Sequence, residues 1–197
     1  PRAALGYAIS ILFKIFNELN LIELSQLDKL KDSADSLKLD SKHYSKIHFT
    51  NNTAICLAEE IFNTFNIIYT SRNMEVVGMR FRAQLAENAK MLASHFLIPE
   101  QNHNEIEAFN NLYIEKINIL WIYDSSNSEK ISKRMRVTSS IISDKVKNHN
   151  IEFNGASFIE RELRIIYFLD WVSFYCSILN NTDPYPVDSI SKLKSLL

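Results

Sequence analysis

The sequence predicts an α/β fold in which a parallel sheet is covered by helices on both faces. From residue 53 onward, short apolar runs with β-forming residues alternate with longer segments of helical periodicity, and this alternation is typical of parallel sheets. The chain of 197 residues is 46% hydrophobic and 23% charged, so it is long and apolar enough to form about one domain.

Four segments have the length and composition of strands. The third is apolar almost without interruption, as expected of a strand that is buried on both faces of a sheet. The predicted strands are NIIYTS (66–71), HFLIP (95–99), INILWIYDSS (117–126) and NIEFN (150–154).

Helical segments separate and follow these strands. Residues 74–91 form the clearest one, because apolar residues recur along it at spacings of three and four. We expect this stripe, the apolar face of residues 158–179 and the rings of Trp121 and Trp171 to lie in the core. The stripe consists of Met74, Val77, Phe81, Leu85 and Leu92. The predicted helices cover residues 53–63, 74–91, 103–113, 129–147, 157–179 and 187–197.

The first fifty residues differ from the rest of the chain. Residues 3–20 have the apolar spacing of a helix, and residues 25–46 are rich in Lys, Asp and Ser, which predicts a polar helix or a loop. We therefore interpret residues 1–50 as a connecting helix and linker, and residues 51–197 as a domain. The chain does not begin with Met, so we expect a fragment of a longer protein. The apolar positions of the first helix are Leu5, Ile9, Leu12, Phe16 and Leu19.

Composition argues against several classes of function. The formal charge of -1 supplies no global field for nucleic acid or an anionic membrane. Polar residues such as Lys14 and Glu18 interrupt the hydrophobic N-terminal segment, so we expect no membrane span. Only three glycines occur, which excludes a dinucleotide fingerprint and a Walker phosphate loop. Cys56 and Cys176 stand in apolar helical contexts, and we expect buried thiols in a reducing compartment, the cytoplasm.

Polar clusters flank the predicted strand HFLIP. Glu87 lies in the last turn of the preceding helix and projects roughly opposite its apolar stripe. His103 stands at the start of the next helix, in a loop beyond the carboxyl end of the strand, where open parallel sheets bind ligands. A carboxylate and an imidazole are common acid–base catalysts. The alternatives are a solvated Glu and a turn His, with Asn102 and Asn104 capping the helix that follows.

Several motifs together resemble the bifunctional phosphoglucose/phosphomannose isomerases. ENAK is followed, sixteen residues after its Glu, by the His of NHNE. The opening PRAALGY resembles the segment that joins the two halves of those enzymes, and IIYTS with RFRAQLAENAK resembles the first strand and helix of their second half. The end of the chain, LDWVSFYCSILNNTDPYPVDSISKLKSLL, resembles their C-terminal tail. The matches run in order through the whole chain, which therefore resembles the C-terminal half.

This resemblance implies a sugar-isomerase (SIS) domain, a flavodoxin-like three-layer αβα sandwich. It implies aldose–ketose isomerisation of glucose or mannose 6-phosphate to fructose 6-phosphate through a cis-enediol, without a metal or another cofactor. By similarity Glu87 would carry the proton and His103, supplied by the neighbouring subunit of a dimer, would assist ring opening. Arg2 would lie near the enediolate oxygens, and Lys194 would help to open the ring. Such a reaction belongs to glycolysis and gluconeogenesis.

Some alternatives remain at this level. Lys192 is two residues from Lys194, and Arg2 is also a candidate for an ordinary salt bridge. The Ser/Thr-rich phosphate loop of the family lies in the N-terminal SIS domain, so we expect this chain alone to be inactive. A non-catalytic sugar-phosphate-binding SIS module is the first alternative function, although regulators of that kind usually carry a basic DNA-binding segment. A pseudo-enzyme half that keeps only the fold and a dimer interface is the second.

Overall fold

A parallel sheet of four strands forms the centre of the molecule within residues 2–47, 51–111 and 116–197, the part of the chain that this computed structural model describes. The strands are β1 (Phe65–Thr70), β2 (Ala93–Leu97), β3 (Ile117–Ile122) and β4 (Lys147–Ile151). Their order is β2-β1-β3-β4, and every pair is parallel. Ile68 of β1 is paired with His95 on one side and with Leu120 on the other. The predicted parallel sheet is confirmed.

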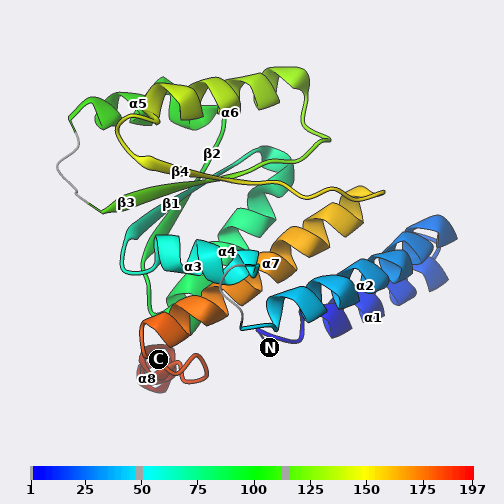
Figure 1. Ribbon diagram of the computed structural model, residues 1–197. Coiled ribbons are helices and arrows are strands. Elements are labelled where there is room, and N and C mark those ends of the chain that lie inside the picture. Colours follow the sequence, from blue (N-terminus) through cyan, green and yellow to red (C-terminus); the bar gives the residue numbers. More distant parts are fainter. Residues whose placement is uncertain (1, 48–50, 112–115) are drawn as a thin grey trace.

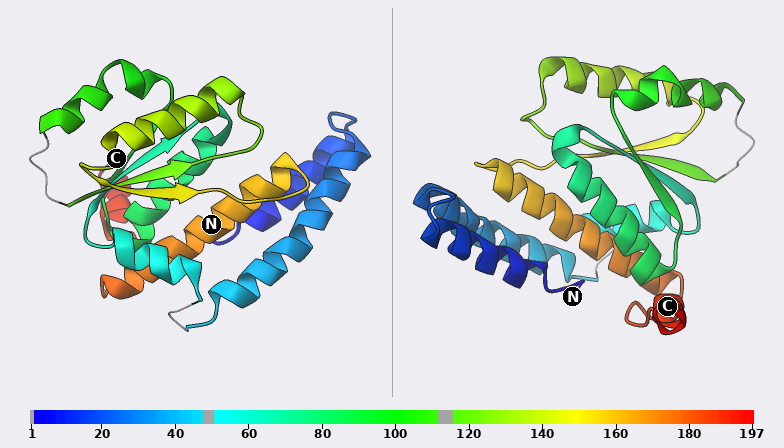
Figure 2. Two further views of the ribbon diagram at one scale, coloured as in Figure 1. Left: turned by 45° about the horizontal axis from the view of Figure 1, so that its top comes forward. Right: turned by 180° about the vertical axis from the view of Figure 1, so that it is seen from behind.

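Helices cover both faces of this sheet, which makes three layers (Figure 1). Helices α5 and α6 lie on one face, and α3, α4 and α7 lie on the other. The hairpin of α1 and α2 lies outside α7, and the views in Figure 2 agree on this arrangement. The α-helices are α1 (Leu5–Glu18), α2 (Leu24–Tyr44), α3 (Thr53–Ile61), α4 (Glu75–Ala89), α5 (Glu105–Ala108), α6 (Glu129–Ile142), α7 (Phe158–Leu179) and α8 (Asp188–Leu196). Three short 3-10 helices are η1 (Arg72–Met74), η2 (Glu100–His103) and η3 (Phe109–Asn111).

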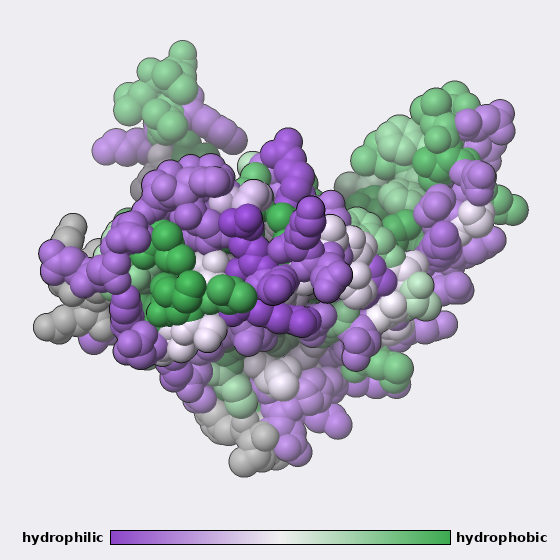
Figure 3. All heavy atoms as spheres, turned by 90° about the horizontal axis from the view of Figure 1, so that it is seen from above, coloured by the Kyte–Doolittle hydropathy of each residue, from purple (hydrophilic) through white to green (hydrophobic). Residues whose placement is uncertain are grey.

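Each face of the sheet has its own hydrophobic core. Every residue of β3 is buried, because alternate side chains of this central strand point into opposite cores. The core on the α3, α4 and α7 side contains Leu120 and Ile122, and the core on the α5 and α6 side contains Ile119 and Trp121. The outer surface of α5 and α6 is mostly hydrophilic (Figure 3).

Side chains at the helix ends explain where several helices begin and stop. The side chain of Asn52 accepts hydrogen bonds from the first amides of α3, and Ser128 and Ser157 cap α6 and α7 in the same way. Helix α4 ends at Lys90, whose φ of 57° is left-handed. This stop places Glu87 in the last turn of α4.

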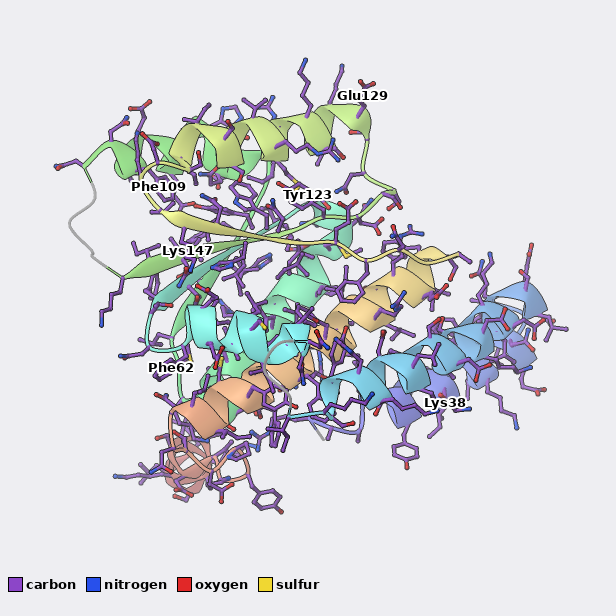
Figure 4. The ribbon with its side chains drawn as sticks, viewed as in Figure 1. Lys38, Phe62, Phe109, Tyr123, Glu129 and Lys147 are labelled. Carbon is purple, nitrogen blue, oxygen red and sulfur yellow. The ribbon has the colours of Figure 1, made fainter. Side chains whose placement is uncertain are left out.

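The last strand and the helix before it differ from the prediction. Helix α6 stops at Ile142 instead of residue 147, and β4 covers residues 147–151 instead of 150–154. Lys147 is predicted as the helix end and residues 148–149 as the connection to the strand, yet the backbone of residues 147–149 pairs with β3 at the edge of the sheet. Figure 4 labels Lys147 at the start of this strand. Strand β2 likewise starts and ends two residues earlier than predicted.

The predicted burial of Leu92 is wrong, and the burial predicted for the two cysteines and the two tryptophans is only partly right. Leu92 is 80% exposed, because α4 ends before it and the chain turns away from the helical stripe. Cys56 is exposed, whereas Cys176 is buried as predicted. Trp121 is buried in the core, but Trp171 is only half-buried.

The N-terminal part forms two helices. Helix α2 shows that the polar segment is a helix and not a loop. Helix α1 buries none of its residues, and Leu12, Phe16 and Leu19 of its predicted apolar face are exposed. Pro1, the boundary predicted at residue 50 and the last two residues of the predicted helix 103–113 lie outside the described residues.

No helix in the described ranges is long and apolar enough to cross a membrane.

Candidate functional site

The C-terminal end of α4 meets both ends of the chain. Because α4 returns from the carboxyl edge of the sheet to the start of β2, its last turn lies at the amino edge. This turn carries Glu87 and Asn88, Arg2 approaches from the N-terminal segment, and residues 183–187 approach from the C-terminal tail. The structure therefore brings two predicted site residues, Arg2 and Glu87, into one cluster.

Arg2 is the centre of this cluster. Its Nε lies 3.3 Å from Oε2 of Glu87, and its Nη1 donates a hydrogen bond of 2.9 Å to Oδ1 of Asn88. Nη1 and Nη2 also donate to the backbone carbonyls of Pro184 and Tyr185, at 2.7 and 2.6 Å. The side chains of Arg2 and Glu87 are 24% and 34% exposed, so this ion pair is partly accessible from solvent.

A second group of polar residues, on α4 and α7, forms hydrogen bonds that hold the backbone of the cluster in place. The guanidinium of Arg80 donates to both carboxylate oxygens of Asp170, at 3.2 and 2.6 Å, and to the backbone carbonyl of Arg2 at 2.9 Å. Gln84 also donates to Asp170, at 2.9 Å. Asp170 thus orients Arg80, which in turn holds the backbone at Arg2.

Sequence reasoning missed these supporting residues. Their signal is the presence of polar side chains inside helices that otherwise bury apolar faces: Gln84 is 5% exposed and Ser173 is fully buried. Ser173 accepts a hydrogen bond of 2.9 Å from Asn88. A buried polar residue without an obvious partner in its own helix indicates a contact with another element.

A groove of about 700 Å³ opens beside the cluster. Arg2, Asn88 and Asp170 line its polar end, and the aromatic side chains of Trp171 and Phe174 line its apolar part. Arg2 and Asn88 therefore form part of the wall of a cavity that is large enough for a small molecule, whereas Glu87 is not among the residues that line it.

His103 lies far from this cluster in the fold. It ends η2, beyond the carboxyl end of β2, whereas Glu87 precedes the amino end of the same strand. Glu87 and His103 are thus at opposite edges of the sheet, and one chain does not bring them together. His103 is exposed, and Asn104 caps α5, as the alternative of a helix-capping Asn predicted. Asn102 instead donates to Thr138 of α6, at 2.7 Å.

Lys194 and Lys192 are both exposed in α8. Neither ammonium group forms a hydrogen bond or an ion pair with a described residue. The chain alone therefore does not distinguish Lys194 from Lys192. The described residues also contain no group of three His, Cys, Asp or Glu side chains that could hold a metal ion.

Solved structures share the fold class of this chain, an α/β sandwich with a parallel sheet between two layers of helices. A glucose-6-phosphate isomerase-like protein from Thermus thermophilus aligns with a TM-score of 0.71 and 14% identity, over 90% of this chain and 59% of that chain. Glucosamine-6-phosphate deaminase from Thermotoga maritima aligns with a TM-score of 0.58 and 10% identity, over 91% of this chain and 52% of that chain. At these identities the likeness shows the fold alone.

Sequence similarity then identifies the family. Residues 50–197 match the family of the bacterial phospho-glucose isomerase C-terminal SIS domain, and the chain belongs to this family. Bifunctional phosphoglucose/phosphomannose isomerase from Caldicellulosiruptor bescii is 32% identical over the whole chain, and that from Aquifex aeolicus is 27% identical. The chain spans 59% and 58% of the length of these two relatives.

Proposed function

We propose that the protein containing this chain interconverts aldose and ketose hexose 6-phosphates, namely glucose or mannose 6-phosphate and fructose 6-phosphate. Membership in the phosphoglucose isomerase family supports this proposal, and so do the relatives named bifunctional isomerases. Residues 1–50 then connect an N-terminal SIS domain to the domain of residues 51–197. The reaction is one that glycolysis and gluconeogenesis share, and we place it in the cytoplasm.

The observation that carries the proposal is the contact between Glu87 and Arg2. Isomerisation needs a base that removes the proton from C2 of the open-chain aldose and returns it to C1. In this proposal the Glu87 carboxylate takes that proton, the C2–H electron pair forms the C1–C2 double bond, and the carbonyl pair of C1 moves to O1. The hydroxyl proton passes from O2 to O1, the pair on O2 then forms the carbonyl at C2, and Glu87 returns its proton to C1. The guanidinium of Arg2, 3.3 Å from this carboxylate, stabilises the negative oxygen of the enediolate.

The other groups of the reaction come from outside this cluster. His103 lies at the opposite edge of the sheet, so we propose a homodimer in which His103 of a second copy assists ring opening at Glu87. Lys194 serves the same step from the tail. The N-terminal SIS domain supplies the phosphate-binding residues, and the chain alone is then inactive.

An isomerase assay of the full-length protein tests the role of Glu87. The wild type and Glu87→Gln are compared for the interconversion of fructose 6-phosphate with glucose 6-phosphate and with mannose 6-phosphate, without added metal. Glu59→Gln, an exposed Glu of α3, is the matched control. We expect turnover with both aldoses in the wild type and control, and a loss of about 10² in kcat for Glu87→Gln. A fully active Glu87→Gln would refute the mechanism, and an inactive wild type that binds sugar phosphate would favour the regulatory module.

Mixing two inactive variants tests the shared site. In a dimer of one Glu87→Gln chain and one His103→Ala chain, one site has both intact residues if they come from different chains. Random mixing then restores about a quarter of the wild-type activity, because half of the dimers are mixed and each has one intact site. If both residues act within one chain, mixing restores nothing.

A further inference from the structure

The tail before α8 is held by side chains and not by regular secondary structure. Pro184 and Pro186 have no backbone N–H to donate, and the N–H of Tyr185 donates to Asp183 within the same turn, at 2.8 Å. The three successive carbonyls of Pro184, Tyr185 and Pro186 nevertheless accept hydrogen bonds from two cationic side chains. Arg2 donates to the first two, and Nζ of Lys90 donates to Pro186 at 2.8 Å.

Lys90 connects this tail to the residue that we propose as the base. Its Nζ donates a second hydrogen bond, of 2.7 Å, to the backbone carbonyl of Glu87. That carbonyl is in the last turn of α4 and lacks a helical partner, and a cation is favourable at this end of a helix. A single ammonium group therefore fixes Pro186 against the backbone of Glu87.

Helix α8 depends on this connection for its position. It begins at Asp188, two residues after Pro186, and buries none of its residues. Because α8 has no buried face of its own in this chain, the segment of residues 183–187 determines where α8 lies. Lys194 is carried by α8, so the distance from Lys194 to Glu87 depends on the bonds made by Arg2 and Lys90.

We propose that Lys90 is a positioning residue of the reaction: its ammonium group joins the carbonyls of Glu87 and Pro186 and so sets Lys194 relative to the Glu87 carboxylate. This inference rests on the proposed function. Lys90 does not touch the substrate and is not a catalytic residue. Arg2 contributes to the same connection, but its proposed contact with the enediolate would obscure this effect in a variant, whereas Lys90 has the positioning role alone.

Substitutions of Lys90 in the full-length protein test the inference. Lys90→Met removes the donors and keeps the length of the side chain, Lys90→Arg keeps donors, and Lys133→Met on the exposed face of α6 is the control. We expect kcat of Lys90→Met to fall about tenfold with a smaller change in KM, since a displacement of about 1 Å in a catalytic group has an effect of this order or larger. Lys90→Arg should stay within about threefold of the wild type, and Lys133→Met should be unchanged.

Combination with Lys194→Ala separates positioning from general destabilisation. If Lys90 acts through Lys194, Lys90→Met should lower kcat less than about twofold further in the Lys194→Ala background. A full tenfold loss in that background would overturn the inference, because Lys90 would then act independently of Lys194. Hydrogen exchange of the amides of residues 188–197 should be faster in Lys90→Met than in Lys133→Met.

The outcomes distinguish this inference from the proposed function. An unchanged kcat in Lys90→Met, or unchanged exchange of α8, overturns the positioning role while the wild type remains an isomerase. A wild type without isomerase activity overturns both, and this is known before any variant is compared. The inference stands if the rate falls, Lys90→Arg restores it, and the loss disappears in the Lys194→Ala background.

Discussion

Nε of Arg2 lies 3.3 Å from Oε2 of Glu87, although the two residues are far apart in the sequence. Glu87 lies in the last turn of α4, and Arg2 precedes α1, the first helix of the N-terminal hairpin. A carboxylate near a helix C-terminus is electrostatically unfavourable, and the cation of Arg2 offsets this disadvantage. The contact thus depends on the N-terminal segment returning to the domain, where the backbone carbonyl of Arg2 accepts from Arg80 at 2.9 Å.

Arg2→Lys in the full-length protein should lower kcat/KM by about tenfold or more, despite the conserved charge. The guanidinium reaches the carboxylate of Glu87, the amide oxygen of Asn88 and two tail carbonyls at once, and a single ammonium group cannot reproduce this planar arrangement. Steady-state isomerase kinetics measure the loss. Arg72→Lys is the control, because Arg72 is 80% exposed at the start of η1. Activity equal to the wild type would show that Arg2 provides charge only.

The sequence was sufficient for the elements of the fold but not for the contacts of the site. An almost uninterrupted apolar run predicted the buried β3, and apolar spacing predicted the stripe of α4, because burial on a helix face repeats with a local period. The limits of β4 were predicted less well, since the polar residues 147–149 have no strand pattern of their own and only pairing with β3 makes them a strand. Cys56 was placed in the core because its neighbours are apolar, yet it lies on the outer side of α3.

Tertiary structure decides which candidate residues meet. The sequence does not say whether Glu87 and His103 of one chain reach the same pocket; in the structure strand β2 runs between them and places them at opposite edges of the sheet. The contact of Glu87 with Arg2 has no local signal at all, because it depends on the path of residues 2–47. The segment ENAK includes Lys90, but the hydrogen bond of Lys90 to Pro186 appears only in three dimensions.

Gly78→Ala should destabilise the chain, whereas Gly6→Ala should stabilise it. A Cβ at Gly78 would lie 2.5 Å from Nε2 of His95 and 2.9 Å from Cγ2 of Thr70, and the hydrogen bond of 2.8 Å between His95 and Thr70 keeps the imidazole in place. Such overpacking costs about 1–3 kcal/mol. A Cβ at Gly6 meets nothing within 4 Å, so Ala there should gain about 0.5–1 kcal/mol of helix propensity.

Urea unfolding of the two glycine variants and the wild type, followed by tryptophan fluorescence, measures these changes. Both substitutions replace Gly by Ala within a helix, at the second residue of α1 and the fourth residue of α4, so the pair separates the packing effect from the general preference of helices for Ala. Equal stabilisation by both substitutions would contradict the close packing of α4 against β2.

Asp124 should make the stability of the chain fall at acidic pH. Burial raises the pKa of this carboxyl. Hydrogen bonds from Arg161, at 2.7 and 3.3 Å, and from Ser126 lower the pKa by more than burial raises it, so the net pKa lies below its usual range. A depressed pKa in the folded state adds stability above the unfolded pKa of about 4 and loses it as the pH falls through the folded pKa. The free energy of unfolding should therefore decline below about pH 4.

Asp124→Asn provides the comparison for this pH dependence. At neutral pH it leaves Arg161, whose side chain is 11% exposed, without its anionic partner, and we expect a loss of about 3–5 kcal/mol. Below about pH 4 the variant should lose less stability with further acidification than the wild type. Urea unfolding at a series of pH values tests both statements, and parallel pH profiles of the two proteins would show that Asp124 does not titrate in this way.

Cys56 should react with iodoacetamide in the folded chain, whereas Cys176 should not. Cys56 is exposed on α3, and Cys176 is fully buried in α7. Burial also raises the pKa of the Cys176 thiol to about 12, so about 10⁻⁴ of it is thiolate at pH 8 and the reactive form is both rare and inaccessible. Mass spectrometry should find one modified cysteine under native conditions and two in urea. Cys56→Ser should show no native labelling, and native labelling of that variant would mean that α7 separates from α3 often enough to expose Cys176.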